Sequence, residues 1–203
     1  MIKKFKDYDQ TKAYGDYEKL PKGGYVMRIL DAVNGRWENR KWVDDPDGDA
    51  IKVSCDIDSG EYHGFFKRDY LNQQSEDKKW RCVYYLNIPQ DDGSEKDAWT
   101  KRRFKTFTEA LEDSNSGYHF DWDEKKFVDK VIGGLFNERE FEGRDGNIAR
   151  ATNFAQVCPV EKIKDGTYKL PADKLLDRTS PATSTSTGFL QIPDNIDEEL
   201  PFK

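Results

Sequence analysis

The chain has 203 residues, of which 35% are charged and 35% hydrophobic, and its net charge at pH 7 is −6. This length suits one domain with appendages, and the acidic balance argues against a uniformly basic nucleic-acid-binding protein while allowing a local basic groove. No run approaches the ~20 apolar residues of a membrane span, and the start of the chain lacks the apolar segment of a signal peptide.

The first sixty residues predict an arm and two strands. Residues 1–20 show no hydrophobic period and are interpreted as an N-terminal arm. Residues 25–33 are dense in apolar, β-prone side chains and predict a first strand, after which Asn34 and Gly35 are typical of a hairpin turn or a bulge. Residues 51–57 alternate apolar and polar side chains and predict a second strand.

The middle and end of the domain predict three more strands around one helix. Residues 62–70 are interpreted as a third strand, and the polar, turn-rich residues 71–98 as an insertion before the helix. The helix is expected over residues 99–115. Residues 131–141 and 147–160 predict a fourth and a fifth strand joined by a glycine-containing turn.

The helix organises this order of elements. Phe104, Phe107 and Leu111 recur at i, i+3 and i+7, so they share one face, and Thr100 is placed as an N-cap. Three strands, a helix and two strands is the order typical of the OB-fold, a five-stranded, partly open Greek-key barrel. We therefore expect a mainly β protein, with an OB-fold-like barrel over residues 21–170 and the helix between strands 3 and 4.

The last part of the chain differs in composition. Residues 171–193 predict a flexible linker, because the segment from residue 180 is rich in Ser, Thr, Pro and Gly. Residues 194–203 form an acidic tip in which a hydrophobic tripeptide follows the acids, a pattern suited to capture by a partner protein. The candidate partner-binding residues of the tip are Asp194, Asp197, Glu198, Glu199, Leu200, Pro201 and Phe202.

The chemistry of metal sites and catalysis is weakly represented. Cys55, Cys82 and Cys158 are far apart and form no C-x-x-C motif, which favours reduced thiols in a cytoplasmic protein over disulfides or zinc. Two acidic groups would suit a two-metal site, but their alternation on strands favours solvated faces; they are Asp56, Asp58 and Glu61, and Glu138, Glu140 and Glu142. We expect no catalytic residue, no metal and no cofactor.

Basic residues interleaved with aromatic residues indicate single-strand binding, because such proteins need cations for phosphates and flat rings for bases. Trp37, Trp42 and Trp80 lie in polar, loop-like contexts and are expected to be exposed. Cations at the expected helix start oppose the helix macrodipole, which hints at a phosphate contact. The candidate DNA-binding residues are Arg36, Trp37, Arg40, Lys41, Trp42, Phe65, Phe66, Lys67, Arg68, Trp80, Arg81, Tyr84, Tyr85, Trp99, Lys101, Arg102 and Arg103.

Several segments resemble known proteins. The tip resembles the acidic, Pro-Phe-ending tip of bacterial single-stranded DNA-binding proteins, although here Leu200 replaces the usual isoleucine and Lys203 follows Phe202. The body is similar to bacteriophage replication-module proteins of Gram-positive hosts, which are regarded as single-stranded DNA-binding proteins. That resemblance lies in YEKLPKGGY, SEDKKW, IPQDDGSEKDAW, ALEDSNSGYHFDWDE and VIGGLFNEREF.

The resemblance implies a bacteriophage single-stranded DNA-binding protein that acts during replication or recombination in the cytoplasm of an infected bacterium. Its tip would recruit host or phage replication or recombination proteins, and it would not bind membranes. A protein-interaction or DNA-mimic module that inhibits a host DNA-binding protein is the alternative, and a nuclease is a third class. The sequence leaves the oligomeric state open, a homo-oligomer included.

Overall fold

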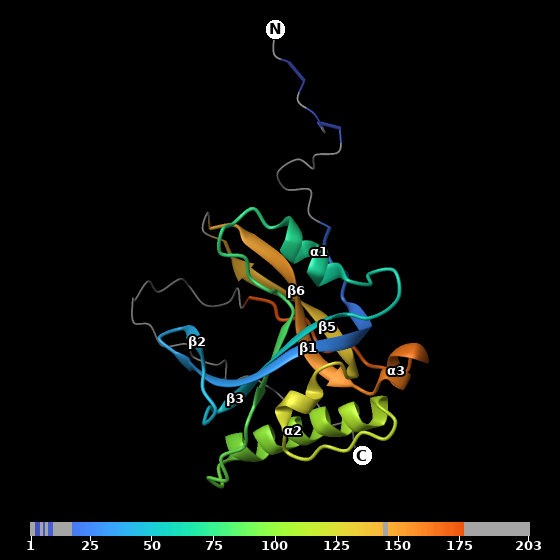
Figure 1. Ribbon diagram of the computed structural model, residues 1–203. Helices are drawn as coiled ribbons and strands as arrows, with labels where there is room; N and C mark the ends of the chain where they lie inside the picture. The colour runs from blue at the N-terminus through green and yellow to red at the C-terminus, as the bar shows by residue number, and fades with distance from the viewer. Residues whose placement is uncertain (1–2, 5, 7, 10–17, 144–145, 177–203) are drawn as a thin grey trace.

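The computed structural model describes residues 3–4, 6, 8–9, 18–143 and 146–176, and within them one antiparallel sheet forms the centre of the protein (Figure 1). The strands are β1 (Gly23–Glu38), β2 (Lys41–Asp44), β3 (Ala50–Ile57), β4 (Val83–Asn87), β5 (Val131–Glu142) and β6 (Ile148–Cys158). The helices are α1 (Phe65–Asn72), α2 (Glu95–Ser114) and α3 (Val160–Lys164), with a 3-10 turn η1 (Glu124–Phe127). The expectation of a mainly β protein is confirmed.

The sheet has the strand order β4-β3-β1-β5-β6, and β2 pairs with the far end of β1. The long strand β1 therefore binds three neighbours, with β3 and β5 on its two sides and β2 folded back on its end. In sequence, α2 separates β4 from β5. A register shift in the β1–β3 pairing and another in the β5–β6 pairing mark irregularities of the bulge type, which increase the local bend of a strand.

The sheet is curved but open. Its edges are β4 and β6, and no ladder joins them in the part of the chain that the structure describes. The rings of Tyr84 on β4 and Phe154 on β6 nevertheless lie 5.1 Å apart, so the sheet bends far enough to bring its two edges into side-chain contact. A barrel is not confirmed.

Helix α2 covers one end of the curved sheet, and its buried face is the one that the sequence predicts (Figure 1). Phe104, Phe107 and Leu111 are all buried. The helix starts earlier than expected, because the side chain of Ser94 accepts a hydrogen bond from the amide of Asp97 and acts as the N-cap. Thr100 instead donates its hydroxyl to a carbonyl within the helix.

The expected third strand over residues 62–70 is wrong, because this segment turns and forms α1. Buried Asp56 explains the helix: its carboxylate accepts hydrogen bonds from the amides of Phe66 and Lys67 at 3.0 and 3.1 Å. These are first-turn amides that have no partner within the helix. The strand that completes the sheet is β4, which comes from the segment interpreted as an insertion.

Other expected boundaries change at both ends of the domain. Leu20, the last residue of the expected arm, is buried in the core. The fifth strand ends at Cys158, and α3 follows it. Residues 171–176 were expected to begin the linker but lie along β5, where the amide of Glu140 donates to the carbonyl of Lys174 at 2.8 Å. The rest of the linker and the whole tip lie outside the described residues.

Candidate functional site

The β1–β2 hairpin brings two tryptophans side by side. Trp37 and Trp42 are directly paired across the hairpin, and their ring centroids lie 5.8 Å apart. The turn consists of Asn39 and Arg40, whose φ values are 48° and 64°. Two consecutive positive φ values match the type I′ turn, whose twist fits a two-residue hairpin. The hairpin turn or bulge expected at Asn34 and Gly35 is wrong, since both residues lie inside β1 and pair with β3 without a register shift.

Tyr85 of β4 joins these tryptophans and completes a cluster of three rings. Its ring centroid lies 5.1 Å from that of Trp37 and 5.3 Å from that of Trp42. We call Trp37, Trp42 and Tyr85 the ring cluster. Burial raises the pKa of Tyr85 above its ordinary value, so this phenol remains neutral at physiological pH.

The ring cluster lies on the outer face of the sheet. Successive side chains of a strand point to opposite faces, and on β3 Ile51 and Val53 are buried whereas Lys52 between them is partly exposed. Lys52 is paired with Tyr85 across β3 and β4, and its ammonium lies 5.5 Å from the Trp42 ring centroid. Trp37 is 53% exposed, so a flat ligand can reach it.

Close packing and one carboxylate hold Trp42 in place. A Cβ atom at Gly35 would lie 2.3 Å from the carbonyl oxygen of Val43 and 2.5 Å from the Trp42 ring, so only glycine allows this approach. The indole nitrogen of Trp42 donates to Asp44 at 2.8 Å. Asp44 also lies 3.4 Å from the ammonium of Lys52. The ring cluster is therefore positioned before any ligand binds.

The cations near the ring cluster differ in their availability. The guanidinium of Arg36 contacts Glu38 at 2.7 Å and Asp45 at 2.9 Å, and its hydrogen bond to Glu38 raises its pKa. Arg40 and Lys41, at the exposed end of the hairpin, form no ion pair with any described residue. These two side chains are thus the cations that can most readily contact a phosphate.

Several other sequence candidates lie in the core and cannot stack on bases in the folded protein. Phe65 and Phe66 are each 9% exposed and Tyr84 is 3% exposed. Trp80, expected in an exposed loop, packs against the core and donates its indole N–H to the carbonyl of Cys55 at 2.9 Å. The neighbouring Arg81 is exposed.

The basic candidates on helices belong to α1 and α2, not to the strands that carry the ring cluster. Lys67 and Arg68 lie on α1, at the other end of the sheet from α2 (Figure 1). On α2, Arg103 binds the hydroxyl of Tyr84 at 2.8 Å and lies over the rings of Tyr84 and Trp99. The exposed side chain of Arg102 also lies on α2.

Lys101 has a structural role at the start of α2. It does not oppose the macrodipole as the sequence interpretation held, because the helix begins at Glu95 and its first turn is acidic. Its ammonium lies 2.6 Å from Asp91 and 2.9 Å from Asp97. The hydrogen bond from Lys101, followed by one from the amide of Gln90, lowers the pKa of Asp97 below its ordinary value.

The carboxylates considered for catalysis also differ from expectation. Asp56 and Glu140 are buried, whereas alternation predicted that they face solvent. Asp56 binds the start of α1, and Glu140 contacts Arg150 at 2.9 Å. The described residues hold no group of three His, Cys, Asp or Glu side chains placed to bind a metal ion.

Sequence reasoning missed three residues that the structure places near candidate surfaces. Lys52 is not among the candidates that the sequence indicates, yet it adjoins two rings of the ring cluster, Tyr85 and Trp42. Asn34 was read as a turn residue and lines a pocket beside α2, to which Trp122 also contributes. Trp122 could have been named as a candidate from the sequence, since it is an aromatic residue within a polar connector.

Comparison with known proteins adds no family assignment. No protein-family model matches the chain, and no curated protein is similar to it. In the described part of the chain, no helix has both the length and the apolar character needed to cross a membrane.

Proposed function

We propose that the protein binds single-stranded DNA without a catalytic step, through base stacking on the ring cluster and phosphate contacts from the hairpin. One observation carries this proposal. Three rings from β1, β2 and β4 gather on an outer surface beside Lys52, with Trp37 more than half exposed. Stacking of bases on aromatic rings provides affinity without sequence selectivity.

The strand order supports the finer proposal that the domain is an OB-fold. With β2 set aside as an extension, five strands follow in the order β4-β3-β1-β5-β6, with α2 between β4 and β5. An OB-fold is a partly open barrel that binds oligonucleotides on the face of its second and third strands and on the loop between its first and second. Those places correspond here to β3, β4 and the hairpin.

Because the net charge of the protein is acidic, we expect base stacking to contribute more to the binding free energy than phosphate contacts do. Electrostatic attraction depends on the phosphates that are neutralised, and each contributes ~0.7 to the salt slope for a single strand. Arg40 and Lys41 are the cations without ion pairs near the ring cluster among the described residues. A shallow salt dependence, with a slope of about −1.4 from two phosphates, is therefore expected.

In the cell, the proposed protein covers single strands during bacteriophage replication or recombination. Its acidic tip, residues 194–203, recruits replication or recombination proteins of the host or the phage; the order of acids and a following Leu-Pro-Phe in the sequence supports this role. The tip lies outside the described residues, so its role rests on sequence alone.

The experiment that tests this function is a titration of the protein into dye-labelled oligo-dT, followed by fluorescence anisotropy at several salt concentrations. Duplex DNA of equal length is the control. Tight binding of oligo-dT with weak binding of duplex supports the proposal. Absence of binding to oligo-dT at low salt overturns it and favours the DNA-mimic alternative, which predicts instead a complex with a host DNA-binding protein.

A further inference from the structure

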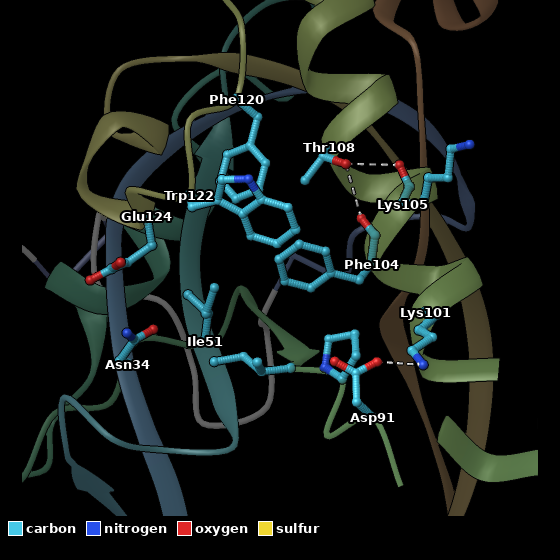
Figure 2. A pocket seen from close by; sticks show the side chains of 12 residues that line it. Asn34, Ile51, Asp91, Lys101, Phe104, Lys105, Thr108, Phe120, Trp122 and Glu124 are labelled. Carbon is cyan, nitrogen blue, oxygen red and sulfur yellow. Dashed lines mark hydrogen bonds and ion pairs between the residues drawn. The ribbon is translucent and has the colours of Figure 1, made fainter. Parts of the chain in front are cut away.

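A pocket of about 520 Å³ lies beside α2, on the inner side of the sheet (Figure 2). Its walls come from elements far apart in sequence: Ile51 from β3, Phe104 from α2, and Phe120 and Trp122 from the connector before η1. This volume lies within the range of small-molecule sites. The ring cluster lies on the opposite face of the sheet, so the pocket is a separate feature.

The aromatic wall of the pocket is set up for a flat ligand. Trp122 is 81% exposed, and its φ of 67° is a left-handed conformation that is costly for a bulky residue. Its ring is within 11° of parallel to that of Phe104, with centroids 6.2 Å apart, and its centroid lies 5.2 Å from that of Phe120 (Figure 2). A strained, exposed indole beside a pocket offers a stacking surface.

One polar group of the pocket lacks a partner. The side-chain oxygen of Asn34 is buried and accepts no hydrogen bond from the described residues. A buried acceptor without a donor is unfavourable, and a ligand that carries an N–H group can correct this. The phenylalanine side chain of a peptide has no N–H group and therefore cannot supply this hydrogen bond. An asparagine amide pairs with adenine, accepting from N6 and donating to N7.

The charges around the pocket suit a base on a phosphodiester strand. Lys101 and Lys105 contribute two positive charges, and Asp91 and Glu124 contribute two negative charges, so the charges of the lining cancel. A free nucleoside triphosphate, with several negative charges, gains little from such a lining. Lys105 is well exposed and has only a 3.5 Å contact with Glu109, so it can reach a single phosphate.

A strand on the ring cluster can reach the pocket. Ile88, which lines the pocket, follows Tyr85 of the ring cluster by three residues. Because β4 is an edge strand of the sheet, a DNA strand can pass around it from the outer face to the pocket.

We propose that this pocket receives one adenine base of the single strand that the ring cluster holds. The inference rests on the proposed function and extends it, because it gives a largely non-specific binder a preference for adenine. Trp122 stacks on the base, and Asn34 pairs with its edge.

The test compares the affinities for oligo-dA and oligo-dT of the full chain and three variants. Asn34→Leu and Trp122→Ala should each weaken oligo-dA binding by about fivefold or more, the lower end of what a bidentate contact contributes, and change oligo-dT binding less than twofold. Thr106→Val is the matched control and should leave both affinities within twofold, since this exposed residue of α2 does not line the pocket and its hydroxyl donates to the carbonyl of Arg102. Self-stacking of oligo-dA affects all variants equally and cancels in the comparison.

Each result of this test has a definite meaning. If oligo-dT binds but the ratio of the two affinities is unchanged in both pocket variants, the adenine pocket is refuted and the proposed function stands. If neither oligonucleotide binds, the proposed function itself fails. Adenosine alone serves as a further probe: quenching of tryptophan fluorescence by adenosine, without a preference for oligo-dA, would assign the pocket to a free nucleoside and overturn the strand-base proposal.

Discussion

Replacement of Trp37 by alanine tests the stacking surface at its most exposed ring. A tryptophan side chain presents up to ~250 Å², and 53% exposure leaves about 130 Å² accessible. A base that covers one face removes about half of this area from water, or ~65 Å². At ~25 cal/mol per Å² this is about 1.6 kcal/mol, a loss in affinity of about 14-fold. The value lies within the ~1–3 kcal/mol known for base stacking.

The assay is anisotropy of labelled oligo-dT, which does not depend on tryptophan emission. Trp99→Ala is the matched control, because Trp99 is 40% exposed but lies on α2 and makes no ring contact with the ring cluster. Its affinity should stay within about twofold of the unaltered protein. Thermal unfolding of both variants checks that the hairpin persists. Equal affinities of Trp37→Ala and Trp99→Ala would refute the reasoning.

Four further changes test other parts of the account. Gly35→Ala places a Cβ atom against Val43 and the Trp42 ring and so forces β2 away from β1. It should weaken oligo-dT binding at least fivefold by anisotropy, with little change in binding if the ring cluster is irrelevant. Gln at both Arg40 and Lys41 should flatten the salt slope by about 1.4, whereas an unchanged slope places the phosphate contacts elsewhere. Asp97→Asn should lower the melting temperature at pH 7 but not near pH 2, because a carboxyl whose pKa is lowered stabilises the fold above its ordinary pKa of 3.8 and loses this effect as pH falls through the pKa of the folded state. A difference in melting temperature that does not depend on pH would exclude the ion pair as the cause. Deletion of residues 194–203 changes the net charge from −6 to −3 and should abolish capture of replication or repair partners from a host lysate without weakening oligo-dT binding. Unchanged capture would exclude the tip as the partner-binding segment.

The sequence predicted elements whose pattern is local. The strand β3 and the apolar face of α2 depend only on neighbouring residues, and both are confirmed, although Asp56 breaks the alternation of β3 because it is buried. The tryptophans of the hairpin were also identified as candidates, because their basic, polar surroundings are visible in the sequence. The sequence does not show which of Tyr84 and Tyr85 faces the core, since the register of β4 against β3 decides which ring is buried.

Errors arose where a distant residue decides the local structure. Adjacent phenylalanines such as Phe65 and Phe66 are typical of a strand. Here the carboxylate of Asp56 accepts hydrogen bonds from the amides at the start of α1 and so favours a helix. Asn34 and Gly35 form a strong turn signal on their own. The pairing of Gly35 with both β2 and β3 keeps it within an extended strand instead.

The central claim is that the ring cluster holds the DNA strand, and photo-crosslinking tests it most directly. Oligo-dT that contains 5-iodouracil is irradiated in complex with the full chain, and the crosslinked residues are located by mass spectrometry. The account predicts crosslinks at Trp37, Trp42 or Tyr85, on peptides from the hairpin and β4. Crosslinks confined to α1, at the other end of the sheet, with none on the hairpin or β4, would contradict it.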